Sequence, residues 1–245
     1  MKVSIITCTW NSRKFLPAAL DSVRRQTHPD IECIFVDGGS DDGTLELIKT
    51  MDRPFRLLYG VGGGISTAMN AGLSAATGDV VAYLHSDDFY LHDSVVADVV
   101  SAFERSAAGW VFGRIMNVIN GRQLAESFRP PPYSRAALLR RNFIPHPATF
   151  VRREWMLAAH GFDVGLRYAM DYDLWLRLSE RGDPVCLPNA LAAFRQHPGS
   201  LSSSNRLEAF LEDHDVRMRY VGSGLFQRVE HRVRFLIRRA RIQSA

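Results

Sequence analysis

Short apolar runs alternate with helix-like segments over the first third of the chain. Runs rich in apolar and β-branched residues predict strands at 3–9, 31–37, 55–60 and 80–84. Between them, apolar residues recur at helical spacing, as at Leu16, Leu20 and Val23, and helices are expected within 15–27, 43–51 and 64–76. This alternation predicts an α/β fold, with a Rossmann-like, mostly parallel sheet flanked by helices.

The pattern loosens after about residue 110. Segments 110–120 and 121–128 favour a hairpin, and the proline-rich stretch 129–134 is typical of a connector. Further along, a helix is expected at 171–182, a strand at 184–194 and a loop at 195–205.

The C-terminal segment predicts a basic amphipathic helix. Apolar residues share one helical face and arginines flank them, from Arg228 to Arg241; the apolar set is Val229, Val233, Leu236, Ile237 and Ala240. Such a helix suits peripheral contact with an anionic membrane surface, but packing on the domain and a dimer contact are equally open. No nucleic-acid partner is expected, because the basic residues are not interleaved with aromatic ones.

Composition narrows the class of protein. The chain has 245 residues, 46% hydrophobic and 23% charged, which excludes disorder and predicts an ordinary folded protein. Cys8, Cys33 and Cys186 lie far apart among apolar residues, so we expect buried thiols and no disulfide framework. The first apolar run is too short for a secretory signal and no run spans a bilayer, so a cytoplasmic location is expected, with possible contact at the inner membrane face.

Carboxylates follow two of the predicted strands. Asp37 ends the run 31–37, and the adjacent pair Asp87 and Asp88 follows the run 80–84. Ligands of open α/β sheets bind beyond the carboxyl ends of the strands. The adjacent pair either caps the next helix or ligates a hard divalent cation on substrate phosphates. Asp37 either forms an Asx-turn or contacts a ligand beside its glycine-rich turn.

Two common nucleotide-binding signatures are missing. The glycine-rich segments 37–44 and 59–66 do not have the spacing of a dinucleotide fingerprint, and no phosphate loop with Gly-Lys-Ser/Thr occurs. Enzymes that use NAD and P-loop enzymes are therefore disfavoured.

An ordered set of motifs resembles the bacterial family 2 glycosyltransferases of the GT-A fold. The motifs are VSIITCTWN (3–11), FVDGGSDDGT (35–44), GISTAMNAGLSAATGDVVAYLHSDD (64–88), HPATFVRR (146–153) and YAMDYDLWLRL (168–178). The resemblance covers about residues 3 to 204. It implies a GT-A domain over 1–205, with a nucleotide-sugar-binding half at 1–110 and an acceptor-side half at 111–205, before a helical basic extension at 206–245.

The resemblance also implies a donor site. Thr7, Thr9, Trp10 and Asp37 correspond to the pocket for base and ribose, in which Trp10 stacks on the base and Asp37 accepts a hydrogen bond from it; Gly64 and Asn70 correspond to positions beside the diphosphate-sugar. The stretch HSDD resembles the Asp-Xaa-Asp motif, and Asp87 corresponds to the ligand of Mg²⁺ or Mn²⁺. His85 replaces the leading acid. Ser86 and Asp88 are counted with the substrate-binding residues, and Asp88 is expected to support the loop.

The acceptor side is implied in the same way. Asp171 matches the catalytic base of an inverting displacement, and the positive end of its helix is expected to keep it ionised. His197 corresponds to a further metal or phosphate contact, His146 to an acceptor-side position and Arg195 to a phosphate contact. From the residues alone, Asp171 could equally be a helix N-cap, and the histidines and Arg195 could be structural or surface residues.

These implications predict a metal-dependent inverting transferase. It would move one sugar from a nucleotide-diphosphate sugar to a saccharide or lipid-linked acceptor in surface polysaccharide or glycolipid assembly. The Gln-Xaa-Xaa-Arg-Trp motif of processive synthases is absent from the sequence, which favours single addition. The alternative is a non-catalytic nucleotide-sugar-binding module. A nucleotidyltransferase would need a basic, glycine-rich N-terminal loop, which this sequence lacks. The oligomeric state is left open.

Overall fold

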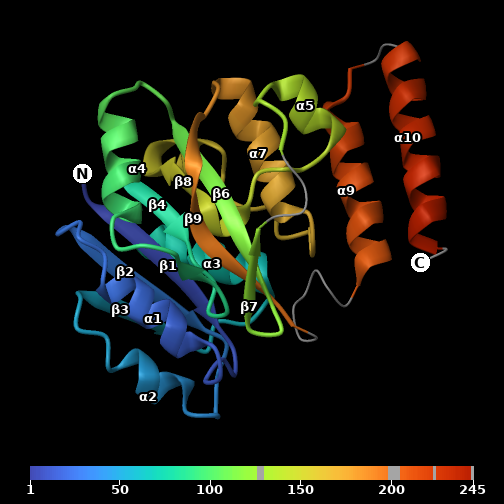
Figure 1. Cartoon of the computed structure of the whole chain (residues 1–245). Coiled ribbons are helices and arrows are strands. Elements are labelled where there is room, and N and C mark those ends of the chain that lie inside the picture. The colour runs from blue at the N-terminus through green and yellow to red at the C-terminus, as the bar shows by residue number, and fades with distance from the viewer. Residues whose placement is uncertain (126–129, 198–204, 223–224, 244–245) are drawn as a thin grey trace.

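The computed structural model describes residues 1–125, 130–197, 205–222 and 225–243 (Figure 1). Its first strands are β1 (Val3–Thr9), β2 (Ile31–Asp37), β3 (Phe55–Tyr59) and β4 (Val80–Tyr83), as predicted. They form a parallel block in the order β3-β2-β1-β4. The register pairs Thr9 with Asp37 and Ile6 with Tyr83, so the carboxyl ends of these strands lie at one edge of the sheet.

Two hydrophobic clusters cover the two faces of this block. Helix α3 (Ile65–Ala75) packs on one face, where Met69 and Leu73 meet Ile6 and Val36. Helices α1 (Leu16–Arg24), α2 (Thr44–Ile48) and α4 (Val95–Glu104) contribute to the cluster on the other face. The sequence pattern predicts α1, α2 and α3, whereas α4 lies in the segment 91–109, for which no element is expected. Because both faces are covered, β1 and β2 are buried along their whole length.

The second half of the chain extends the same sheet with mixed strand directions. Beyond β4 the order is β8 (Thr149–Arg152), β6 (Trp110–Ile119), β9 (Val185–Gln196) and β5 (Phe89–Tyr90). Strand β7 (Arg122–Ala125) pairs antiparallel with β6, which confirms the predicted hairpin over its described part. The predicted loop at 195–205 begins within β9, and its residues 198–204 lie outside the described residues.

The helices of the second half are α5 (Arg135–Arg140), the short 3₁₀ helix η1 (His146–Ala148), α6 (Arg153–Ala158), α7 (Met170–Arg181), α9 (Arg206–Tyr220) and α10 (Leu225–Gln243). Residues of α5, α6, α7 and α9 join the hydrophobic cluster on the face of the sheet that α3 covers. Helix α9 stands beside α7, and α10 is the outermost helix, next to α9 (Figure 1). Helix α7 confirms the helix predicted at 171–182. No helix in the described ranges is long and apolar enough to cross a membrane.

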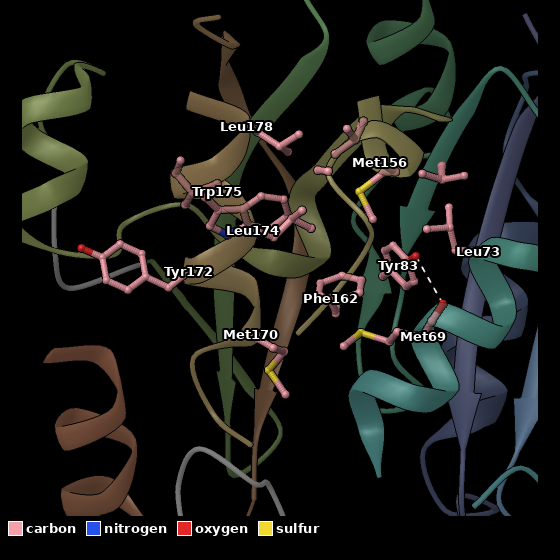
Figure 2. Packing of buried hydrophobic residues seen from close by; sticks show 14 of the residues in the cluster. Met69, Leu73, Tyr83, Met156, Phe162, Met170, Tyr172, Leu174, Trp175 and Leu178 are labelled. Carbon is pink, nitrogen blue, oxygen red and sulfur yellow. Dashed lines mark hydrogen bonds between the residues drawn. The ribbon is translucent and has the colours of Figure 1, made fainter. Parts of the chain in front are cut away.

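Aromatic packing connects α7 to the sheet. The rings of Trp175 and Trp110 stack with centroids 5.9 Å apart, and Phe162 meets Tyr83 edge to face at 5.0 Å. Figure 2 shows Trp175 on α7 and the rings of Phe162 and Tyr83 between α7 and α3, with the Tyr83 hydroxyl directed to the carbonyl of Met69. Buried aromatic pairs of this kind fix relative positions, so α7 is held against β6, and the loop that precedes it is held against β4.

The cysteines differ in one respect from expectation. Cys8 and Cys33 are buried free thiols, as expected, but Cys186 is exposed. Cys186 lies in β9 between residues that are only partly buried, because this end of β9 is near the margin of the sheet.

We predict that Gly72→Ala destabilises the protein. A Cβ at this position of α3 would lie 2.4 Å from Cγ2 of Ile6 and 3.2 Å from Cγ2 of Val36. Overpacking of this kind costs about 1–3 kcal/mol, which outweighs the gain of about 1 kcal/mol that alanine brings to a helix interior. Urea unfolding measures the change in free energy.

The matched control is Ser74→Ala on the exposed side of the same helix, for which we expect a change within about 0.5 kcal/mol. A more stable Gly72→Ala variant would contradict the close seating of α3 on β1.

Candidate active site

Two adjoining cavities open at the carboxyl edge of the parallel block. The first is about 320 Å³, and its lining includes His85, Asp87, His146 and Asp171. The second is about 360 Å³ and lies between the ends of β1 and β2 and the start of α3. The two share the lining residues Cys8, Trp10 and Ile65. Together they have the size of a site for a small-molecule ligand.

Trp10 stands at the wall common to both cavities. Its side chain is 73% exposed, although the seven residues of β1 before it are buried. Thr9, Gly38 and Gly64 also line the second cavity. An exposed indole beside a narrow pocket offers a flat apolar surface on which a planar ring can stack. The structure thus brings together three of the residues expected at the donor site.

The start of α3 forms another wall of the second cavity. Gly64, the N-cap residue, has φ +90°, a left-handed conformation that favours glycine, and no side chain caps the helix. The first N–H groups of this 11-residue helix therefore lack side-chain partners at the cavity wall. Such an end favours an anionic group.

Asp37 forms the Asx-turn that was one of its two expected roles, and its contact with a base stays a prediction. Its carboxylate is fully buried and accepts four hydrogen bonds: from the hydroxyls of Thr9 and Ser40, both at 2.7 Å, and from the backbone N–H of Gly39 and Ser40 at 2.9 and 2.7 Å. Burial disfavours its charge, but these hydrogen bonds outweigh burial and lower its pKa. Four donors use the acceptor sites of a carboxylate. Asp37 therefore holds the turn beside Trp10, and in this structure it offers no acceptor to a base.

Two further expected site residues lie away from both cavities. Thr7 is buried on the other face of β1, where it borders a small cavity with Ala19 and Leu20, because successive strand residues point to opposite faces. The next residue, Cys8, takes its place in the walls of both cavities. Asn70 binds the backbone of Phe162 through both its amide atoms, at 2.8 Å each, and so ties α3 to that loop.

The loop after β4 presents its acids in two different ways. Asp88 is 2% exposed, and its carboxylate accepts a hydrogen bond from the backbone N–H of Arg195 at 3.0 Å. Burial, with the charge of Asp87 beside it, raises the pKa of Asp88 well above its usual range. Arg195 also donates from Nε to the carbonyl of Asp87 at 3.0 Å. Asp88 and Arg195 therefore hold this loop in shape, while Ser86 reaches Ser12 through its hydroxyl at 2.9 Å.

Asp87 and His197 form the donor set best suited to a cation. Asp87 Oδ2 lies 3.1 Å from His197 Nε2, and Asp87 lines the first cavity. Among the described residues, no group of three or more His, Cys, Asp or Glu side chains could hold a metal by itself. One carboxylate and one imidazole nevertheless fit a cation that keeps waters and takes its remaining ligands from substrate phosphates.

Two stacked histidines form part of the first cavity wall. The rings of His85 and His146 are nearly parallel, 6° apart, with centroids separated by 5.0 Å. Burial lowers the pKa of both histidines. The charge of Asp87 raises the pKa of His85 in part, and His85 lowers the pKa of His146 further. Nε2 of His146 is buried and has no hydrogen-bond partner. The pair is therefore neutral and can exchange hydrogen bonds with a polar ligand.

Asp171 lies in the first turn of α7 and lines the same cavity. Its Oδ1 accepts from the backbone N–H of Tyr172 at 2.6 Å and from Nδ2 of Asn142 at 3.5 Å. Burial, reinforced by the charge of Asp213, raises the pKa of Asp171 to about 7. The expectation that the helix end keeps this carboxyl ionised is therefore wrong, because burial exceeds the effect of the helix. Asp173 is buried elsewhere and pairs with Arg177 at 2.8 Å.

Helix α9 contributes residues that the sequence analysis placed in a separate extension. Ala209 lines the first cavity, and the Glu212 carboxylate accepts from the backbone N–H groups of Arg167 and Tyr168, both at 2.7 Å. Arg217, two turns after Ala209, donates to the Tyr172 hydroxyl at 3.2 Å. Asp213 lies between them on the same helical face, next to α7. No local sequence motif identifies these residues, because their place in the site results from the packing of α9 beside α7.

Comparisons with known proteins agree with this geometry. Residues 4–157 match the family described as glycosyl transferase family 2. An uncharacterized glycosyltransferase of Mycobacterium tuberculosis is 31% identical over 78% of this chain and 74% of its own length. Chondroitin synthase and hyaluronan synthase of Pasteurella multocida are each 32% identical, over 87% and 74% of this chain. The chain spans only 22% and 19% of the length of those synthases.

Solved structures share the fold. TarS of S. aureus in complex with UDP-GlcNAc superposes with a TM-score of 0.73 at 20% identity, over 88% of this chain and 66% of that one. A mannosyltransferase of Pyrobaculum calidifontis in complex with GDP-Man and Mn²⁺ gives a TM-score of 0.70 at 18% identity, over 89% and 64%. The family match over most of the chain, the mycobacterial relative and the shared architecture show that this protein belongs to glycosyl transferase family 2 and has the GT-A fold.

Proposed function

We propose that the protein transfers one sugar from a nucleotide-diphosphate sugar to a saccharide or lipid-linked acceptor, with inversion and with the help of Mg²⁺ or Mn²⁺. The observation that carries the proposal is the placement of Asp87 and Asp171 in the wall of the first cavity. This cavity adjoins the second cavity beside Trp10. One cavity thus offers a position for a departing diphosphate and a base for an incoming hydroxyl.

The donor fits the second cavity. Trp10 offers its indole to the base, and the N-terminal end of α3 at Gly64 faces the region where phosphates would follow. The related structures named above hold UDP-GlcNAc and GDP-Man. Asp37 supports this site indirectly, because it shapes the turn that borders Trp10.

Asp87 and His197 are the residues that would hold the cation. When bound, it would neutralise charge on the departing diphosphate. Asp88 and Arg195 keep the loop of Asp87 in place from behind. The neutral His85 and His146 pair can orient hydroxyl groups between Asp87 and Asp171, since all four line the first cavity.

Asp171 accepts the proton in this scheme. As the acceptor oxygen attacks the anomeric carbon, its proton passes to the Asp171 carboxylate, the bond from that carbon to the phosphate oxygen breaks, and the configuration inverts. A base with a pKa of about 7 combines a substantial ionised fraction near neutral pH with useful basicity.

The setting of the reaction is also part of the proposal. We place it in the cytoplasm, in surface polysaccharide or glycolipid assembly, by single addition of a sugar. The three cysteines are free thiols, which fits a reducing compartment.

A panel of nucleotide sugars tests the proposal. UDP-, GDP- and dTDP-sugars are added with and without Mn²⁺, and we expect one class to raise the melting temperature in a metal-dependent way. Asp171→Asn should keep this donor binding and lose transfer. If no nucleotide sugar stabilised the protein, the enzyme proposal would fail; binding without turnover in wild type, across an acceptor panel, would favour a binding module.

The cation position is tested by Asp87→Asn. We expect transfer to fall by roughly 100-fold or more, because an amide does not replace the carboxylate charge at the cation, and donor binding should no longer respond to Mn²⁺. The control is Asp98→Asn on α4, a partly exposed acid away from both cavities. Unchanged metal dependence in Asp87→Asn would exclude Asp87 as the ligand.

The pH profile tests the setting of Asp171. Activity should rise with pH through about 7 as Asp171 loses its proton. Asp213→Asn removes a neighbouring negative charge, so the pKa of Asp171 should fall and the acidic limb of kcat should move to lower pH. The exposed Asp215 on the same helix supplies the control, Asp215→Asn, which should leave the limb in place. If the acidic limb of kcat stayed at the same pH in Asp213→Asn, the charge of Asp213 would not set the pKa of Asp171.

A further inference from the structure

The outermost helix, α10, carries an exposed row of aliphatic side chains. These four residues form the outer stripe and are 49 to 55% exposed: Val229, Val233, Leu236 and Ile237. Their spacing of four, three and one residues places them on one face of the helix. Scattered apolar residues are common on surfaces, but a continuous row along one helix suggests an interaction surface.

The opposite face of α10 already has its packing partner. Phe235 stacks on Phe210 and His214 of α9, with ring centroids 5.3 and 3.9 Å apart, and His231 is 8% exposed. At 100° per residue, His231 and Phe235 lie on the side away from the outer stripe. Packing on the protein body therefore uses one face of α10 and leaves the outer stripe directed outward, as the position of α10 in Figure 1 allows.

Positive charge borders the outer stripe on both sides. Arg232 and Arg239 lie along one margin, and Arg234 lies along the other together with Glu230; all three arginines are exposed. Glu230, the acid in this part of α10, lies 3.0 Å from Arg234 and 3.8 Å from Arg140, so its charge is balanced. The surface is thus apolar along its centre and basic at its edges.

We propose that the outer stripe docks the protein on an anionic lipid surface, with α10 lying in the plane of the interface. Aliphatic side chains would enter the acyl boundary, while the arginines reach the anionic headgroups. A second copy of this chain fits less well, because two such faces in contact would bring their arginine margins together.

Docking in this way has a geometric consequence. Helix α9 lines the first cavity through Ala209, and α10 packs on α9. A lipid-bound α10 would therefore hold the cavity close to the membrane surface. The inference is independent of the proposed transfer reaction, since lipid binding is measured without nucleotide sugar or acceptor.

Vesicle flotation with the full chain tests the inference. Vesicles are made of phosphatidylcholine alone or with about one third phosphatidylglycerol. We expect binding to the anionic vesicles and not to the neutral ones, and binding should weaken as salt rises. The double substitution Leu236→Glu with Ile237→Glu should weaken it by roughly tenfold or more. The control Val164→Glu alters an aliphatic residue that is 64% exposed outside α10, and it should bind like wild type.

Three outcomes would overturn the inference. They are absence of vesicle binding, equal binding to neutral and anionic vesicles, and binding that the double substitution leaves unchanged. Light scattering addresses the second copy, because a dimer that the double substitution disperses, without vesicle binding, would assign the outer stripe to self-association. Since the altered residues are exposed, both variants should keep the wild-type melting temperature, which separates lost binding from lost folding.

Discussion

Strand β1 is the constraint on which the rest of the structure depends. It pairs in parallel with β2 on one side and β4 on the other, and its residues are buried on both faces. A strand fixed in this way cannot slip, because a shift of one residue would turn every side chain to the opposite face, where the packing of the other hydrophobic cluster has no room for it. Its register therefore determines where Trp10 stands, which turn Asp37 must hold and where the loop with Asp87 begins.

The part of the chain that carries Asp171 is placed by contacts that are distant in sequence. Asp171 belongs to α7, and α7 is fixed by the stacking of Trp175 on Trp110. The loop before α7 is fixed from the other side by Glu212 of α9, which takes up two of its backbone N–H groups. The position of Asp171 thus depends on one aromatic stack and on the partly buried carboxylate of Glu212, and α9 contributes to the cavity wall although it follows the matched family region.

The features that depend on local sequence pattern could be predicted from the sequence. The strands were predictable because β-branched runs such as 31–37 are buried on both faces, and residues in motif loops, such as Trp10 and Asp87, do meet in the adjoining cavities. Helix α4 also has apolar residues at helical spacing, such as Val95, Val99 and Phe103, although no helix was expected there. Side-chain direction was harder, since Thr7 and Cys8 are neighbours on opposite faces of β1. Partners such as Asn70 and Phe162, 92 residues apart, leave no local signal.

The protonation of Asp171 shows how tertiary packing overrides a local rule. A helix N-terminus stabilises a carboxylate by about 0.3–1 kcal/mol, and by up to about 2 kcal/mol in favourable geometry. The rise of the Asp171 pKa from 3.8 to about 7 corresponds to roughly 4 kcal/mol in the opposite direction. Burial and the charge of Asp213 therefore raise the pKa of Asp171 by more than the helix end can lower it. In the proposed role of a base this is an advantage, because a carboxylate that is costly to keep charged would take a proton readily from an acceptor hydroxyl and release it again near neutral pH.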